Sequence, residues 1–148
     1  SNERHWKWAV EPNRREKASF LKENILPIEE SGQLKFISEQ EQWMPGIDIL
    51  FANGHTDAQM IPKIRYKERT LVFMADLLPS VGHFPIPFVM GYDTRPLLTL
   101  DEKEKFLNEA AAKDYLLMFQ HDSVNECCSV EMTDKGVRAK ELFKLSDI

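Results

Sequence analysis

The fold is indicated most strongly by an apolar run that ends in a carboxylate, Thr70-Leu71-Val72-Phe73-Met74-Ala75-Asp76. Its branched and aromatic residues predict a buried strand that stops at Asp76. The polar turn Lys67-Glu68-Arg69 stands before it, and the stretch 60–66 before that turn is again mostly apolar. The pattern therefore predicts a hairpin whose second, buried strand ends at an acidic residue.

Two more apolar runs end beside a residue that can bind a metal. His55 follows the run 47–52, which begins after the turn signal Pro45-Gly46, and His121 follows the run 115–120. Strand ends lie along one edge of a sheet, so we expect His55, Asp76 and His121 to converge. Alone, each has a plain structural explanation, a surface or core histidine or an aspartate that caps a loop. Together, two imidazoles and a carboxylate suit zinc, iron or manganese.

The rest of the chain predicts a mixture of helices, strands and one long loop. The first thirty residues show helical periodicity that is interrupted at Pro12-Asn13 and ends at Pro27. The stretch 77–98 is rich in proline and has no period, which favours a functional loop. The remaining expected elements are a strand at 34–37, a helix from Thr99 or Asp101 to about Tyr115, a strand at 128–132 and a basic helix in the tail.

Composition limits the class of protein. The chain has 148 residues, 43% of them hydrophobic, which is enough for a single domain over 1–148. The net charge of −5 provides no basic stripe, so we expect no nucleic-acid partner. No apolar run suits a membrane span or a signal peptide, and the adjacent Cys127 and Cys128 rarely bridge to each other. We therefore expect no membrane partner and a cytoplasmic, reducing location.

At its candidate ligands the sequence resembles the metallo-β-lactamase superfamily, and most closely its lactonase-like and phosphotriesterase-like branch. Gly54-His55-Thr56 is similar to the glycine-histidine-threonine turn of that family. Ala75-Asp76-Leu77-Leu78-Pro79 and Phe119-Gln120-His121-Asp122 look like two later family motifs. The resemblance implies an α/β fold, namely the C-terminal half of a four-layer αβ/βα sandwich with a mixed sheet and flanking helices.

The resemblance also implies a chemistry. His55 would bind one metal, His121 a second, and Asp76 would bridge both, with zinc the default and iron or manganese the alternatives. The two divalent ions would activate a water that hydrolyses an ester, lactone or phosphotriester bond in a small-molecule substrate. Asp76 and His83 are then the candidate catalytic residues, with His83 assisting the substrate or leaving group, unless it is simply an exposed loop histidine. Asp122 is expected to orient an imidazole.

Two departures from the family pattern matter. Gln59 stands where relatives commonly have another histidine, close to the ligand His55. The N-terminal signature of two histidines one residue apart, followed by an aspartate and a histidine, is not found, and the isolated His5 cannot replace it. We therefore expect the chain to lack an N-terminal half and to be inactive alone. The missing half, or a second chain as in a homodimer, would complete the site.

Two other interpretations stay open. In the first, the chain is a non-catalytic binding domain derived from the same fold. In the second, it is an isolated fragment whose bare sheet edge drives association. In the enzyme interpretation we expect the loop residues Phe84 and Phe88 to line an apolar pocket.

Overall fold

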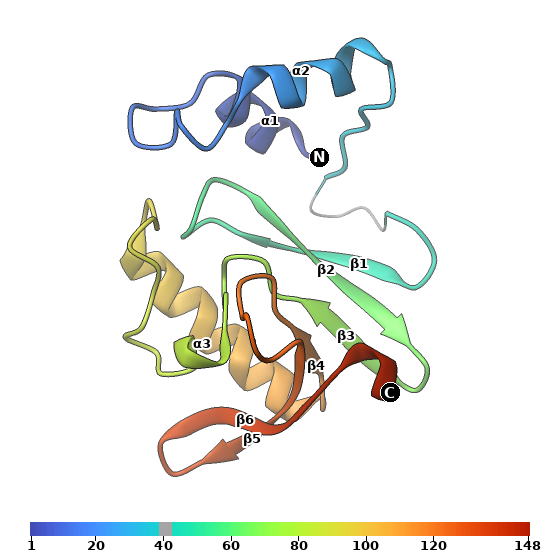
Figure 1. The fold of residues 1–148 in the computed structure, drawn as a ribbon, viewed down its shortest axis with the longest axis vertical. Coiled ribbons are helices and arrows are strands. Elements are labelled where there is room, and N and C mark those ends of the chain that lie inside the picture. The colour runs from blue at the N-terminus through green and yellow to red at the C-terminus, as the bar shows by residue number, and fades with distance from the viewer. Residues whose placement is uncertain (39–42) are drawn as a thin grey trace.

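The computed structural model describes residues 1–38 and 43–148 and forms one mixed sheet with three α-helices (Figure 1). The N-terminal part holds α1 (Glu3–Val10) and α2 (Lys22–Glu30). The sheet contains β1 (Ile47–Ala52), β2 (Gln59–Tyr66), β3 (Arg69–Phe73), β4 (Leu116–Met118), β5 (Cys127–Thr133) and β6 (Gly136–Phe143). Between β3 and β4 lie the short 3₁₀ helix η1 (Val81–His83) and α3 (Pro96–Ala112), and η2 (Leu145–Asp147) follows β6.

The strands are arranged in the sheet in the order in which they occur in the sequence. Every neighbouring pair is antiparallel except β3 and β4, which are parallel and are connected through η1 and α3. Because β1 and β3 are both antiparallel to β2, the strands β1, β3 and β4 run in the same direction. Their C-terminal ends therefore lie at one edge of the sheet, as the sequence pattern predicts.

The core lies between the sheet and α3 (Figure 1). Phe106, Leu107 and Ala110 of the helix are buried against sheet residues such as Val72 and Leu117. Burial of side chains as large as phenylalanine or leucine stabilises a fold by about 1.5–3 kcal/mol each. The contacts therefore fix the position of α3, and with it the loop 77–95 that precedes the helix.

The N-terminal helices lie at the β1–β2 end of the sheet (Figure 1). The Asn2 side chain caps α1 by accepting a hydrogen bond from the His5 backbone N–H at 2.8 Å. The Asn2 amide also donates to the Ala58 carbonyl, again at 2.8 Å. None of the helices within 1–38 and 43–148 is long and apolar enough to cross a membrane.

Two predictions for the N-terminal part are wrong. Pro27 does not end a helix but lies inside α2, which is partly exposed and continues to Glu30. The alternating stretch 34–37 belongs to no strand. Instead, the Ile37 N–H donates to the Ser1 carbonyl at 3.0 Å, and the Ser1 ammonium donates to the Lys35 carbonyl at 3.1 Å. These contacts with the chain's start take the place of a sheet partner.

Two predictions for the C-terminal half are also wrong. The helix α3 begins at Pro96, before the expected cap, because proline at the first helical position needs no hydrogen-bond partner for its nitrogen. The tail is strand β6 instead of a helix. The turn at Gly136, with a φ of +85°, returns the chain antiparallel to β5. Pairing with β5 outweighs the helix preference of the lysine, glutamate and leucine residues in this stretch.

Candidate functional site

The structure brings His55, Asp76 and His121 together at the C-terminal edge of β1, β3 and β4. Each is the third residue after the end of its strand. The His121 Nε2 lies 3.0 Å from one Asp76 carboxylate oxygen, and the His55 Nε2 lies 3.6 Å from the other. A single carboxylate thus stands between two imidazoles, one oxygen facing each.

Local backbone geometry turns Asp76 toward this position. Strand β3 ends at Phe73, earlier than predicted, and Ala75 has a φ of +45°. This left-handed conformation is uncommon for residues other than glycine and often occurs at functional sites. On the other side, the Gln59 side-chain amide donates to the Asp76 Oδ2 at 3.2 Å. Gln59 therefore holds the carboxylate.

Asp93 is a site residue that the sequence analysis missed. Its Oδ1 lies 2.8 Å from the His55 Nδ1, and its side chain is fully buried. Burial alone lowers the pKa of His55, but the hydrogen bond with Asp93 and the negative charges of Asp76, Asp93 and Glu16 outweigh it and raise the pKa. Asp93 is hydrogen-bonded to Nδ1 and so leaves Nε2 directed at Asp76, which fixes the orientation of the His55 ring.

Asp122 does not have the role predicted for it. Its carboxylate accepts hydrogen bonds from the Val81 N–H at 3.0 Å and the Asn125 N–H at 2.8 Å. Burial favours its neutral form, but the backbone donors of Asn125, Val81 and Val124 outweigh it and lower the pKa of Asp122 to about 2. Asp122 therefore fixes the loop after β4 to the start of η1, while Asp93 orients the imidazole.

His83 lies in η1, on the His121 side of the site. It lines a cavity of about 250 Å³ together with His121 and Tyr92. The His83 Nδ1 is 2.8 Å from the Ser80 hydroxyl. Burial, followed by the positive charge of Lys103, lowers the pKa of His83. Both effects favour the neutral imidazole, and one ring nitrogen is hydrogen-bonded to a hydroxyl.

The two predicted pocket aromatics occupy different environments. Phe84 is only 2% exposed and belongs to the core, where its ring packs edge-to-face on Phe119, so its predicted pocket role is wrong. Phe88 is 58% exposed on the loop. Two other aromatic residues border the site, namely Phe20, beside His55, and Tyr92. Tyr92 lines both the cavity beside His121 and a second one, of about 360 Å³, beside His55.

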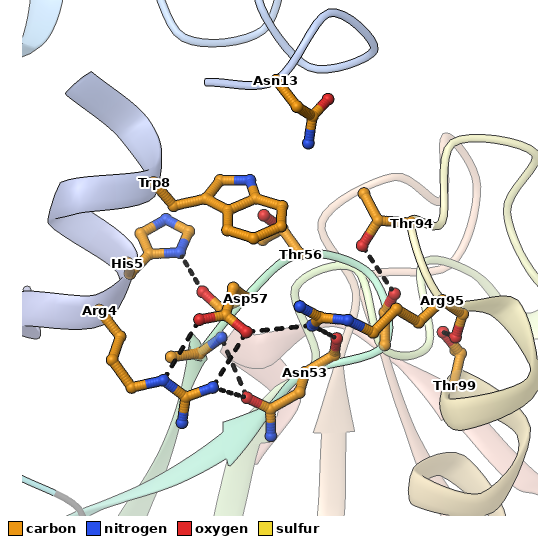
Figure 2. Close-up of polar contacts among 12 residues, drawn as sticks. Arg4, His5, Trp8, Asn13, Asn53, Thr56, Asp57, Thr94, Arg95 and Thr99 are labelled. Carbon is orange, nitrogen blue, oxygen red and sulfur yellow. Dashed lines mark hydrogen bonds and ion pairs between the residues drawn. The ribbon is translucent and has the colours of Figure 1, made fainter. Parts of the chain in front are cut away.

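The turn that carries His55 is held by charged groups from α1 and α3 (Figure 2). Asp57 accepts from Arg4 at 2.9 Å and lies 3.0 Å from the Arg95 guanidinium. The Glu102 carboxylate accepts the Asn53 N–H at 2.8 Å and the Gly54 N–H at 2.9 Å. The turn therefore cannot shift without breaking several charge-assisted hydrogen bonds.

A second acidic side chain fixes the turn from the N-terminal part. Glu16, which is 8% exposed, accepts the Thr56 hydroxyl at 2.7 Å and the Asn13 amide at 2.6 Å. The indole N–H of Trp8 also donates to it. The residues next to His55 are thereby connected to the segment between α1 and α2.

Replacement of Gly54 by alanine is expected to destabilise the fold by about 1–3 kcal/mol. A Cβ at this position would lie 2.5 Å from the Thr99 nitrogen and 2.6 Å from the Thr99 Cα, which are backbone atoms of α3 that cannot rotate away. Urea unfolding measures the loss. The control is Gly91→Ala, where a Cβ meets nothing within 4 Å. Equal stability of the two variants would contradict the argument.

Replacement of Asp93 by asparagine is expected to lower the pKa of His55. The change keeps the shape of the side chain but removes its negative charge, which favours the imidazolium. An NMR titration of the His55 ring measures the effect, with Asp134→Asn on the exposed β5–β6 turn as the control. A His55 pKa that is unchanged in Asp93→Asn would show that Asp93 does not act on this ring.

Comparison with known proteins identifies the fold. A probable metal-dependent hydrolase from Staphylococcus aureus matches with a TM-score of 0.77 and 23% identity, over 93% of this chain and 50% of that chain. The hydrolase AbOPH of the beta-lactamase superfamily has a TM-score of 0.73 and 17% identity, over 94% and 50% of the two chains. AidC, a dizinc quorum-quenching lactonase, has a TM-score of 0.71 and 18% identity, over 97% and 53%.

The chain thus has the α/β fold of metallo-β-lactamase-type proteins and spans about half the length of these solved structures. This confirms the resemblance to the C-terminal half of such a domain and the predicted mixed sheet with flanking helices. No family model and no curated protein sequence matches the chain. The roles of His55, Asp76, His83 and His121 stay predictions.

Proposed function

We propose that this chain supplies part of the active site of a metal-dependent hydrolase of the metallo-β-lactamase type. One observation carries the proposal: the two Asp76 oxygens face the Nε2 atoms of His55 and His121, at 3.6 Å and 3.0 Å. A carboxylate with one imidazole at each oxygen has the donor types of a bridged pair of divalent ions.

The imidazole nitrogens and carboxylate oxygens present here are ligand atoms that such ions accept. His55 with one Asp76 oxygen would hold one ion, and His121 with the other oxygen would hold the second. Bound there, divalent zinc, iron or manganese would activate a water and polarise the substrate. Among residues 1–38 and 43–148, no group of three or more His, Cys, Asp or Glu side chains is arranged to hold an ion. We therefore propose that an N-terminal half or a second chain provides the remaining ligands.

The chain's own residues would prepare this site. Asp93 fixes the His55 ring through Nδ1, and Gln59 fixes the Asp76 carboxylate. His83 shares a cavity with His121, and burial lowers its pKa, so its imidazole would transfer a proton to or from a substrate in that cavity. Its hydrogen bond to Ser80 orients the ring for this role.

We propose a small molecule with an ester, lactone or phosphotriester bond as the substrate. The cavities beside His121 and His55, of about 250 and 360 Å³, suit a compact ligand. Among the structurally similar proteins, AidC is a lactonase and another is an N-acyl homoserine lactone hydrolase, so a cyclic carboxylic ester is the first substrate to test.

The test uses the full-length protein that contains residues 1–148. Its metal content is measured by mass spectrometry, and a panel of lactones, carboxylic esters and phosphotriesters is hydrolysed with and without a chelator. We expect about two ions per chain, loss of hydrolysis with the chelator and recovery on addition of zinc. Fewer than one ion per chain, or hydrolysis that is insensitive to the chelator, would contradict the proposal.

A non-catalytic binding domain is the second candidate function. It is favoured by the same observation that the described part of the chain assembles no group of three metal-ligating side chains. This alternative predicts a full-length protein without bound metal and without hydrolysis on the panel. The same two measurements therefore separate the two functions.

A further inference from the structure

Lys103 is a cationic residue in the middle of the apolar face of α3. It is only 1% exposed, and the buried residues on the same face are Thr99, Phe106, Leu107 and Ala110. Removing an ammonium from water costs several kcal/mol unless other groups compensate. The contacts of Lys103 should therefore explain why a charge is placed here.

The ammonium donates to three backbone carbonyls of the loop before α3. The Lys103 Nζ lies 3.0 Å from the carbonyl oxygen of His83, 3.1 Å from that of Pro85 and 2.6 Å from that of Phe88. An ammonium has three N–H donors, so each donor has one acceptor. Segment 83–88 belongs to no strand and contains prolines without an N–H. The lysine thus supplies donors to this segment, and the Pro85 carbonyl also accepts the Phe88 N–H at 2.9 Å.

The loop that Lys103 holds is a wall of the candidate site. Ser80, His83, Val89 and Met90 from this loop line the cavity of about 250 Å³ that also contains His121. Between them, Phe84 points into the core and packs on Phe119. Lys103 therefore fixes the core side of the loop through polar contacts, and Phe84 fixes it through apolar contacts.

Asp93 and His83 are the ionisable groups that interact with this ammonium. Burial lowers the pKa of Lys103 to about 8, and the negative charge of Asp93 opposes the shift. The amine is therefore still protonated at pH 7. One Asp93 oxygen is bonded to His55, and the other is buried without a hydrogen-bond partner within the described residues. The positive charge of Lys103 also contributes to the lowered pKa of His83.

We propose that Lys103 is a positioning residue for the candidate site: its ammonium fixes segment 83–88 through three carbonyls and places a positive charge near the His83 imidazole. A contribution of this loop to hydrolysis rests on the proposed function. The fixing of the loop by Lys103 does not rest on the proposed function, because it follows from contacts within this chain.

Hydrogen exchange tests the fixing of the loop. In Lys103→Met, which has a similar length but no donors, we expect amide exchange within 83–90 to become at least tenfold faster, while β5 keeps its wild-type protection. The matched control is Lys105→Met, an exposed lysine on the same helix. Wild-type exchange within 83–90 in Lys103→Met, or an equal increase across the sheet, would overturn the proposal.

Two NMR measurements test the charge and the contacts. The His83 pKa should rise in Lys103→Met and keep its wild-type value in Lys103→Arg, which retains the cation. Packing of the lysine's aliphatic stem alone would not make the two variants differ in the His83 pKa. Equal His83 pKa values in Lys103→Met and Lys103→Arg would refute the charge effect.

If Lys103→Met does not fold, the second measurement uses the wild-type chain at pH 6.5. A slowly exchanging Lys103 ammonium with couplings to the carbonyl carbons of residues 83, 85 and 88 is expected, and a freely exchanging ammonium overturns the proposal.

These experiments need neither metal nor substrate. Failure of the metal and hydrolysis tests would therefore leave the role of Lys103 in the loop standing. Conversely, failure of the exchange and NMR tests would leave the proposed hydrolase untouched.

Discussion

Zinc affinity of the full-length protein is expected to fall by roughly a hundredfold or more when Asp76 is replaced by asparagine, because loss even of an indirect partner of a metal ligand typically costs 10–100-fold. Asp76 is the carboxylate that faces both His55 and His121. Asparagine keeps the shape but has one neutral oxygen, so it cannot bridge two cations. Calorimetric titration with zinc measures the change.

The control for this variant is Asp101→Asn, which removes an exposed charge from α3. Its zinc affinity should match that of the wild type. The His55 pKa, measured without metal, is a second test, because the negative charge of Asp76 helps to raise it. The His55 pKa should therefore fall in Asp76→Asn. Wild-type zinc affinity in Asp76→Asn would rule out a bridging role for this residue.

Replacement of Phe84 by alanine is expected to destabilise the fold by about 3–5 kcal/mol. Phe84 is 2% exposed, and its ring lies 6.4 Å from the ring of Phe119, centroid to centroid, in an edge-to-face arrangement. The smaller side chain leaves a cavity beneath the loop and removes this aromatic contact. The free energy of unfolding in urea measures the loss.

The neighbouring Phe88 provides a matched control. It lies on the same loop but is 58% exposed, so Phe88→Ala should change the free energy of unfolding by no more than about 0.5 kcal/mol. If the two variants lost the same stability, Phe84 could not be the core residue that the structure shows.

The sheet edge was the most predictable part of the molecule. Apolar runs before His55, Asp76 and His121 indicate strands, and strands with the same direction bring their ends to one edge. That convergence follows from short-range pattern and sheet geometry. The tail was mispredicted because its residues favour helix individually, while the hairpin pairing with β5 is a contact between two segments that single-residue preference does not include.

The partners of the candidate ligands were less predictable. Asp93 comes from a proline-rich loop without a period, so nothing local shows that it reaches His55 rather than solvent. Asp122, adjacent to His121 in sequence, is the partner that the sequence predicts, yet its carboxylate accepts hydrogen bonds from backbone N–H groups. Lys103 is similar, since one lysine in a helical sequence gives no sign that three loop carbonyls surround it.

The order of the strands has a consequence for how the chain folds. Each strand pairs with its neighbours in sequence, so most of the sheet is built from contacts between residues close together along the chain. Strands joined by tight turns pair readily, because little loop entropy is lost before their contacts form. The exception is the β3–β4 pair, which closes only after the intervening loop and α3 are placed (Figure 1). We therefore expect hairpins β1–β2 and β5–β6 to form early and docking of α3 to limit the folding rate.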